Sequence, residues 1–561
     1  MAETKREIER KYELPSRSGA AGPAASGASP GLPDLTRAKG VDSVRDDGVV
    51  ELDAVYYDTP DLRLAADSLT LRRRTGGEDA GWHLKLPVSR GVRDEIRAPL
   101  TDTVPEELTT LLRSRVRDAE LVPVVRLRTS RDIRRLLGGD GAPLAEVSVD
   151  TVRAQRLGDA VVATSWTEVE VELADDADPA LLDAVDKKLR KAGLRPASAA
   201  SKLSRALAET APTENAGKRA GTAGAAPPGK ASGKGAGKRA AKGAGKGAGK
   251  RAGKGVGKAS TKGAKARATA ADQVLAYLRT QADAIVAQDP AVRRDLPDAV
   301  HQLRVATRRM RSAFRTYGKV IDRSVTDPIG EELKWLAAEL GVDRDQEVLN
   351  ERMRSRIAEL PGTLLLGPVS ARLSIWNAGR RAGSRSRTVA VLDSERYLAL
   401  LERLDVLLRD PPLRSAAAKR PGKVLPAAIL KDYRRLAGRV ERALELPPGE
   451  ERDIALHNAR KAAKRARYGA EAAKPALGKA AKRFAKRMKA LQTVLGDHQD
   501  SVVAREALRD LGVHSHAAGE SAFTWGLLYG HEEAQAARRE REMPQVWAKA
   551  AVPKLRAALA G

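Results

Sequence analysis

Three charged residues near the start of the chain, Glu7, Glu9 and Lys11, recur at every second position. In a β-strand alternate side chains point to the same face, so these three would share one side of the strand. Two carboxylates about 6.6 Å apart can each bind a hard divalent cation, and a lysine beside them adds a positive group. Because charged side chains are rarely buried unless they are paired or bound to metal, this face is expected to hold a metal-bound anion rather than a packed core.

The same two-residue spacing returns in two basic pairs and a second acidic run: Arg72 and Arg74, Arg126 and Arg128, and Glu168, Glu170 and Glu172. These residues lie in or beside short alternating segments that predict strands over 49–57, 69–74, 81–86, 122–127, 144–149 and 167–173. Between the glutamates, Val169, Val171 and Leu173 are expected to pack outward against a helix spanning 179–191. A plain solvent-exposed sheet is one interpretation. Both signs of charge on so many strands favour a closed barrel with a charged lumen around a phosphate chain.

Composition limits the class of protein. A chain of 561 residues predicts two or three domains, and the absence of cysteine excludes disulfides and thiolate metal sites, which fits a reducing cytoplasm. The first residues lack the apolar stretch of a secretion signal, and no segment approaches the roughly 18 apolar residues that a membrane span needs. The net charge of +28 predicts a polyanionic partner, and with only 3% aromatic residues phosphate is a better target than nucleobases.

A lysine-rich segment divides the chain. Residues 216–271 carry 15 Lys or Arg and no Asp or Glu, and a lysine recurs every four residues from Lys230 to Lys262. The intervening glycines would each cost a helix about 1 kcal/mol, so the segment predicts a disordered linker over 209–271. This linker is either a spacer or an arm that contacts polyanions, nucleic acid included, without sequence preference. A Gly/Ala/Ser/Pro-rich segment over 15–33 is expected to be an insertion between the first two strands.

Beyond residue 271, long Ala-, Leu- and Arg-rich segments predict a bundle of helices. A basic pattern occurs twice, 156 residues apart and with identical offsets: His301, Arg304, Arg308 and Arg311, and then His457, Arg460, Lys464 and Arg467. At about 100° per residue, each set falls on one narrow stripe of its helix. Segments 336–345 and 491–500 repeat in the same register, which indicates an internal duplication.

Each basic stripe is expected to line a groove for anions, because like charges at i,i+3 and i,i+4 repel and cost helix stability. The alternative is a solvated face, or one paired to acids such as Asp345 and Asp500. Neither His301 nor His457 has a carboxylate or a second histidine one turn further along, so phosphate hydrogen bonding is favoured over metal binding. A third basic run over 479–487 lies on a helix of its own and is a candidate for a merely solvent-exposed face.

Six motifs of residues 1–208, in order, resemble those of the CYTH domain of triphosphate tunnel metalloenzymes: Glu7-x-Glu9-x-Lys11, Tyr56-Tyr-Asp-Thr-Pro-Asp61, Leu71-Arg-Arg-Arg74, Trp82-His-Leu-Lys-Leu-Pro87, Glu168-x-Glu170-x-Glu172 and Ser201-Lys-Leu-Ser-Arg205. The resemblance implies an eight-stranded antiparallel tunnel that binds a triphosphate with a divalent metal, Mg²⁺ or Mn²⁺. Members of the family hydrolyse inorganic or thiamine triphosphate, or cyclise ATP.

The same resemblance implies roles for individual residues. Metal binding falls to Glu7, Glu9, Asp150, Glu168, Glu170 and Glu172. Phosphate binding falls to Lys11, Arg72, Arg74, Lys85, Arg126, Arg128 and Lys202, and Glu146 would also face inward. The catalytic set comprises Glu7, Glu9, Lys11, Glu170 and Glu172, and a metal-held or carboxylate-held water attacks in line. The residues offer no Ser/His/Asp or cysteine nucleophile for a covalent route.

The His301-x-x-Arg-Val-x-x-Arg-Arg-x-Arg311 pattern resembles that of the CHAD domain, and the likeness spans residues 272–555. It implies two helical sub-bundles related by pseudo-twofold symmetry, with a basic surface that binds inorganic polyphosphate. In the second copy Lys461 replaces the valine and lysines replace some arginines. That change loses the bidentate fork of arginine, so tighter phosphate contacts are expected in the first half.

Together these features predict an α+β multidomain protein, with an antiparallel eight-stranded tunnel over 1–208, a linker over 209–271 and a duplicated helical bundle over 272–555. The expected function is metal-dependent hydrolysis of inorganic triphosphate or polyphosphate, with the helical domain binding polyphosphate. One alternative is a non-catalytic cytoplasmic protein that targets itself to polyphosphate granules. Another is an adenylate cyclase or thiamine triphosphatase on the same tunnel. No membrane contact is expected, and the oligomeric state is left open.

Overall fold

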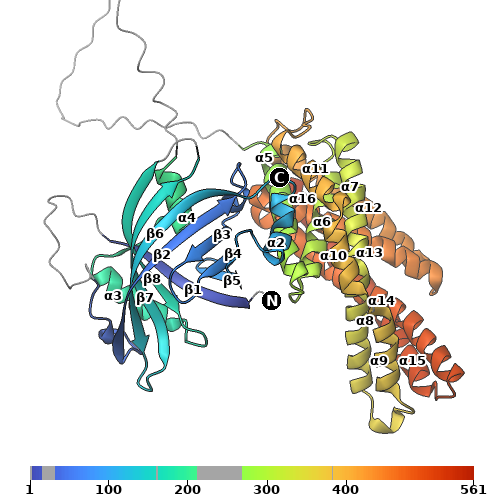
Figure 1. The fold of residues 1–561 in the computed structure, drawn as a ribbon. Coiled ribbons are helices and arrows are strands. Elements are labelled where there is room, and N and C mark those ends of the chain that lie inside the picture. Colours follow the sequence, from blue (N-terminus) through green and yellow to red (C-terminus); the bar gives the residue numbers. More distant parts are fainter. Residues whose placement is uncertain (1–2, 15–31, 159–161, 212–267, 382, 561) are drawn as a thin grey trace, which may run out of the picture.

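The computed structural model describes residues 3–14, 32–158, 162–211, 268–381 and 383–560, which form a barrel and a helical domain lying side by side (Figure 1). The predicted insertion over 15–33 and the predicted linker over 209–271 fall almost wholly outside these residues. Among the described helices, none combines the length and the apolar character that crossing a membrane requires.

Eight long antiparallel strands form the barrel: β1 (Glu3–Glu13), β2 (Ser43–Asp58), β3 (Thr70–Thr75), β4 (Gly81–Ser89), β5 (Val92–Ala98), β6 (Val122–Leu137), β7 (Pro143–Arg156) and β8 (Ala163–Leu173). They follow the order β5-β4-β3-β2-β6-β7-β8-β1, and β1 returns to pair with β5, so the sheet closes. A short strand, β9 (Arg195–Pro196), pairs with the end of β1. The predicted antiparallel barrel is therefore confirmed, although the sequence reasoning missed β5.

β1 closes the barrel by pairing with two strands in succession. Residues 3–8 lie against β5, and residues 9–13 lie against β8. The alternation of β1 sends Tyr12 outward, where it is buried with Val169 and Val171 of β8 against α3 (Ala180–Lys191). This outward packing was predicted correctly, and it leaves the intervening charged residues facing the lumen.

One end of the barrel is closed by α4 (Lys202–Glu209), which begins with a capping box. Leu203 of this helix is fully buried with Leu127 of β6, Val152 of β7 and Trp166 of β8. This apolar packing anchors the helix in the barrel end. It also brings Lys202, the first residue of the helix, into the lumen.

The helical domain consists of α5 (Ala270–Arg293), α6 (Ala299–Thr316), α7 (Arg323–Glu339), α8 (Gly341–Ala358), α9 (Val369–Arg381), α10 (Ser384–Asp393), α11 (Glu395–Arg409), α12 (Pro421–Glu445), α13 (Glu450–Ala472), α14 (Lys474–Ala517), α15 (Phe523–Ala550) and α16 (Pro553–Ala560). The stripe-bearing helices α6 and α13 pack together, and the hydroxyl of Tyr317 donates to the carbonyl oxygen of Gly469 at 2.6 Å. The two repeats differ locally, because 336–345 contains the break between α7 and α8 whereas 491–500 runs uninterrupted through α14.

The barrel meets the helical domain at α2 (Glu106–Val116), which covers the outer face of β3 to β5 (Figure 1). Arg117, just after α2, pairs with Glu402 and, at 2.6 Å, with Asp405 of α11. From the barrel wall, Asp94 of β5 pairs with Arg294, just after α5, at 3.0 Å. Among the described residues every buried apolar cluster belongs to one domain alone, so charged contacts carry much of this junction.

Candidate functional site

Glu7, Glu9 and Lys11 lie on one face of β1, as the spacing predicted, and that face lines the lumen. Glu7 is 3% exposed and Glu9 is 9% exposed. Each carboxylate has a cation in contact. The Nζ of Lys85 lies 2.7 Å from both oxygens of Glu7, and the Nζ of Lys11 lies 3.0 Å from Oε2 of Glu9. Burial alone would raise the pKa of Glu9, but the charges of Lys11, Lys85 and Arg93 together outweigh it and the pKa is lowered.

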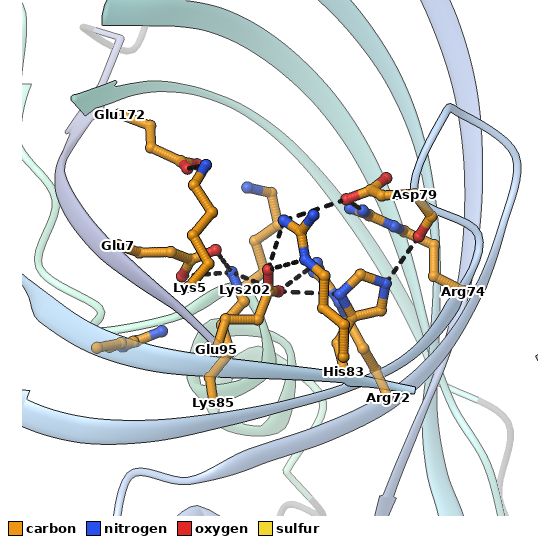
Figure 2. Close-up of polar contacts among 12 residues, drawn as sticks. Lys5, Glu7, Arg72, Arg74, Asp79, His83, Lys85, Glu95, Glu172 and Lys202 are labelled. Atoms are coloured by element: carbon orange, nitrogen blue, oxygen red, sulfur yellow. Dashed lines mark hydrogen bonds and ion pairs between the residues drawn. The ribbon is translucent and has the colours of Figure 1, made fainter. Parts of the chain in front are cut away.

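Strands β3, β4 and β5 supply a basic wall of the lumen, made of Arg72, Arg74, Lys85 and Arg97, with Glu95 among them. Figure 2 shows Arg72, Arg74, Lys85 and Glu95. One oxygen of Glu95 lies 3.3 Å from the Nζ of Lys85 and 3.7 Å from an Nη of Arg72. Its other oxygen accepts from Arg97 at 2.7 Å. Burial would raise the pKa of Glu95, but the charge of Lys85, the hydrogen bond with His83 and the charge of Arg72 together hold the pKa well below its usual range. Three of the four cations of the wall thus contact one ionised carboxylate.

Two arginines of the basic wall keep hydrogen-bond donors to spare. An Nη of Arg72 donates to the hydroxyl of Tyr56 at 3.3 Å. The Nε atoms of Arg72 and Arg74 are buried and have no hydrogen-bond partner among the described residues. Guanidinium groups carry five donors in a planar fork, so these two can take phosphate oxygens in addition to their protein contacts.

Strands β7 and β8, which lie across the barrel from β4 and β3 in the strand order, supply an acidic cluster of Asp150, Glu168 and Glu170. One carboxylate oxygen of each lies within 4.8 Å of the other two. The Nζ of Lys202, from α4, contacts all three carboxylates at 2.8, 2.9 and 2.6 Å. Arg131 of β6 contacts Asp150 at 2.7 Å and Glu170 at 2.8 Å. The cluster is therefore compact and internally charge-paired.

The acidic cluster fits a divalent metal. Burial would raise the pKa of Glu170, but Lys11, Lys202 and Arg131 hold it well below its usual range, so the carboxylate is ionised. Convergent carboxylate oxygens are the ligands that Mg²⁺ and Mn²⁺ prefer. The three other predicted ligands lie outside this group, since Glu7 and Glu9 contact lysines of their own and Glu172 pairs with Lys5 at 2.8 Å.

The two basic stripes of the helical domain meet where α6 and α13 pack together. Arg304 pairs with Asp345 at 2.9 Å, and its equivalent Arg460 lies 3.5 Å from Asp500. For these two arginines, the alternative of pairing with neighbouring acids is confirmed. Each arginine also lies close to a glycine in the segment that carries its aspartate. A Cβ at Gly341 would lie 2.7 Å from Arg304, and one at Gly496 would lie 3.4 Å from Arg460.

Arg308 and Lys464 form the central pair of the two stripes. Neither makes an ion pair among the described residues, and the Nε of Arg308 is buried without a hydrogen-bond partner there. Burial, with Arg460 and Arg308 close by, lowers the pKa of Lys464 to about 8. Burial likewise lowers the pKa of Arg308. Two half-buried cations that repel each other and lack carboxylates are typical of an anion site.

The remaining stripe residues lie to either side. Arg311 lines a basic cavity of about 690 Å³ between α6, α7, α12 and α13. Arg467 pairs with Glu471 at 3.0 Å, His301 is half-buried on α6, and His457 lines a different cavity. The structure therefore gathers four of the eight predicted residues into one basic cluster between α6 and α13, here called the CHAD cluster: Arg304, Arg308, Arg460 and Lys464.

Sequence comparison agrees with this two-part geometry. A CYTH domain model matches residues 33–207, and a CHAD domain model matches residues 276–509. The uncharacterized proteins Rv2226 and MT2285 of two Mycobacterium tuberculosis strains are each 36% identical over 507 residues, covering 88% of this chain and 88% of theirs. The chain belongs to the CYTH–CHAD family.

Three solved structures resemble parts of this CYTH–CHAD protein. PptA from Streptomyces chartreusis (TM-score 0.43, 22% identity) covers 50% of this chain and 100% of its own. The CHAD domain from the plant Ricinus communis has a TM-score of 0.36 and 24% identity, and the match covers 52% of this chain and 92% of that domain. The third is the adenylyl cyclase candidate HpAC1 from Hippeastrum, described as having a dominant triphosphatase activity. Its TM-score is 0.21 at 17% identity, and the match covers 36% of this chain and 96% of HpAC1. Family membership rests on the domain matches and the mycobacterial relatives.

Two predicted phosphate ligands of the CYTH tunnel do not reach its lumen. Arg126 and Arg128 point outward from β6, and Arg126 pairs with Asp53 on the outer face of β2 at 2.6 Å. The reason is Leu127, which points inward to pack on α4 and so forces its neighbours outward. The expected inward position of these two arginines is therefore wrong.

Arg131 and Glu95 are site residues that sequence reasoning missed. Arg131 lies beyond the predicted end of its strand, in a stretch with little apolar alternation. Glu95 lies on β5, where Arg93, Glu95 and Arg97 repeat the two-residue charge spacing seen in β1. That spacing was a usable signal. It was obscured because Asp94, on the opposite face, is charged as well.

Replacing Lys202 with alanine is expected to weaken the CYTH barrel. The change leaves three clustered carboxylates without their shared ammonium, and breaking a buried ion pair costs about 3–5 kcal/mol. Hydrogen–deuterium exchange should show faster exchange of the β7 and β8 amides, with partial recovery on adding Mg²⁺. Lys187→Ala, on the exposed side of α3, is the matched control. Unaltered exchange in the Lys202 variant would mean that the cluster is stable without its lysine.

Proposed function

We propose that the CYTH domain is a metal-dependent triphosphatase acting on inorganic triphosphate or polyphosphate, and that the CHAD domain binds polyphosphate. The observation that supports the first part is the presence, in one lumen, of the acidic cluster on β7 and β8 and the basic wall on β3 to β5. CYTH domains include triphosphatases and adenylate cyclases, so an enzyme is in keeping with the family.

In this mechanism the basic wall binds the substrate. Arg72 and Lys85 donate to phosphate oxygens and stabilise the charge that develops on the transferring phosphoryl group, and Arg74 is a further donor for a longer chain. Lys202, on its four-carbon stem, turns from the acidic cluster to the phosphate chain. Binding is thus divided between a rigid guanidinium fork on the strands and a flexible ammonium on α4.

The acidic cluster supplies the second half of the mechanism. Asp150, Glu168 and Glu170 would hold Mg²⁺ or Mn²⁺, which neutralises phosphate charge and lowers the barrier to in-line attack. We assign to Glu9, whose charge interacts with that of Glu170, the orientation of the attacking water. A carboxylate beside the water can also accept its proton.

A substrate panel tests the enzyme proposal. The full chain is incubated with Mg²⁺ or Mn²⁺ and with tripolyphosphate, long-chain polyphosphate, thiamine triphosphate or ATP, and released phosphate and cyclic AMP are measured. Phosphate release from tripolyphosphate is expected. Cyclic AMP from ATP would instead assign the tunnel to the cyclases, and no turnover of any substrate would overturn the enzyme proposal.

A non-catalytic polyphosphate-binding protein is the second candidate. Its support is the internal pairing of the acidic cluster, in which Lys202 contacts every carboxylate that a metal would need. A divalent metal must displace that ammonium before it can bind. Titration with Mn²⁺ separates the two candidates, because the enzyme requires a saturable site that the Glu170→Gln variant loses.

The affinity of the CHAD cluster for long-chain polyphosphate is expected to fall as the pH rises through about 8. Lys464, with a pKa lowered to about 8, is mostly protonated at neutral pH and mostly neutral one to two units higher. Bound polyanion favours the protonated form, so binding should take up protons near the midpoint. Calorimetry across this range measures both effects. Lys464→Arg keeps its charge and should flatten the profile; a slope that persists in that variant would implicate another group.

A further inference from the structure

The loop between β3 and β4, residues 76–80, lies at the end of the tunnel opposite α4. At the α4 end, Val122 at the start of β6 pairs with Asp58 of β2. β3 begins beside that end, with Leu71 opposite Tyr57, and runs away from it. The loop that follows β3 is therefore at the far end, where a chain longer than the lumen would emerge.

Asp79 of this loop contacts the basic wall (Figure 2). Its carboxylate contacts Arg74 and lies 3.7 Å from an Nη of Arg97. Its carbonyl oxygen lies 2.9 Å from Nε2 of His83, whose Nδ1 lies 3.0 Å from Glu95. The Asp79 carboxylate thus pairs with two of the four cations of the basic wall.

The backbone fixes where this loop starts. Gly76 and Gly77 have φ values of 81° and 73°, which lie in the region that favours glycine. A Cβ at Gly76 would lie 2.2 Å from the carbonyl oxygen of Glu51, so no side chain fits there. The base of the loop therefore packs closely on β2, and this fixed base positions Asp79 beside Arg74.

The loop's hold on the wall depends chiefly on the Asp79 carboxylate. A neutral imidazole has a single N–H, whereas the carbonyl of Asp79 and the carboxylate of Glu95 are both acceptors. Burial lowers the pKa of His83 to about 4, so at neutral pH only one of its two contacts is a hydrogen bond. A competing anion therefore has two ion-pair contacts to break, those of Asp79 with Arg74 and with Arg97.

We propose that Asp79 is a specificity-determining residue that restricts the tunnel to short phosphate chains, an inference that rests on the proposed function. A triphosphate is held between the acidic cluster and Arg72, short of the loop. A longer chain must pass Asp79, whose charge repels it and whose carboxylate competes with it for Arg74 and Arg97. Arg74 is 5% exposed and has an unpartnered Nε among the described residues, so it can bind such a chain once Asp79 yields.

The test compares the full-length variants Asp79→Asn and Glu78→Gln. Glu78 is the exposed neighbour of Asp79, so its change removes equal charge without touching the basic wall. Both changes are made in an Arg308→Ala/Lys464→Ala background, which removes the central pair of the CHAD cluster. Calorimetry without added metal, where no turnover occurs, measures affinity for tripolyphosphate and for long-chain polyphosphate.

Asp79→Asn is expected to tighten binding of the long chain about tenfold and to leave tripolyphosphate nearly unchanged, while Glu78→Gln alters neither. An equal gain for both chains would overturn the proposal, because Asp79 would then compete with any anion. Unchanged affinity for both chains, or weaker affinity for both, would also overturn the proposal, since Asp79 would then have no effect on binding or only a structural role. Failure of the proposed function looks different: the unaltered protein releases no phosphate, whatever these affinities are.

Discussion

Replacing Glu170 with glutamine is expected to lower kcat for tripolyphosphate by about 100- to 1,000-fold. Glu170 is the point at which the acidic cluster meets its cations, because Lys11, Lys202 and Arg131 all contact its carboxylate. Glutamine keeps the shape but loses the charge that would hold a metal and that orients these three cations. Single-turnover phosphate release at saturating Mg²⁺ or Mn²⁺ is the measurement.

A matched control for Glu170→Gln is Asp53→Asn. Asp53 pairs with an arginine as Glu170 does, but on the outer face of the same barrel, where it contacts Arg126 at 2.6 Å. This control should retain normal kcat. A nearly normal kcat in Glu170→Gln itself would show that phosphoryl transfer does not depend on the acidic cluster, and the assignment of the metal to β7 and β8 would fall.

Removing the central pair of the CHAD cluster, in the double variant Arg308→Ala/Lys464→Ala, is expected to weaken long-chain polyphosphate binding by about 100-fold. A hydrogen bond to a charged group contributes about 1.5 kcal/mol or more, which is about tenfold in affinity for each residue. Both cations lack carboxylate partners among the described residues, so little internal compensation offsets the loss. Calorimetry at fixed ionic strength measures the change, since salt weakens all such contacts.

The matched control for the CHAD cluster variant is Lys482→Ala/Lys486→Ala. These lysines belong to the third basic run, and both are exposed on α14. The control removes the same charge from the same domain, so a loss caused by net charge alone would appear in both variants. Equal weakening in the two would mean that polyphosphate binds diffusely, and the CHAD cluster between α6 and α13 would not be a site.

The strand alternation of the sequence predicted the tunnel well wherever the outer face was apolar. Tyr12 and Val169 pack outward on α3, so Glu9 and Glu170 on the alternate positions face inward as expected. At the end of the barrel that α4 closes, the inward and outward positions of β6 were opposite to those predicted. There Leu127 points inward and packs on α4, and no local pattern in β6 indicates that a helix of residues 202–209 closes that end of the lumen.

The contacts of the site depend on tertiary structure that periodicity cannot supply. The sequence placed Lys202 among the phosphate ligands, but its contacts with Asp150 and Glu168 follow from how α4 enters the barrel. In the CHAD domain the repeat predicted two equivalent stripes. Which members meet was decided by the packing of α6 on α13, which brings Arg308 to Lys464 and leaves Arg467 paired with Glu471.

The junction between the two domains has a character of its own. Arg117 binds Glu402 and Asp405 across it, and Asp94, on a strand whose other face lines the tunnel, binds Arg294. Attraction between such charges is screened over about 8 Å at physiological ionic strength, whereas the apolar core inside each domain is not screened. The relative position of tunnel and bundle is therefore sensitive to salt in a way that neither fold is. A polyanion crowding these arginines would act on the junction as added salt does.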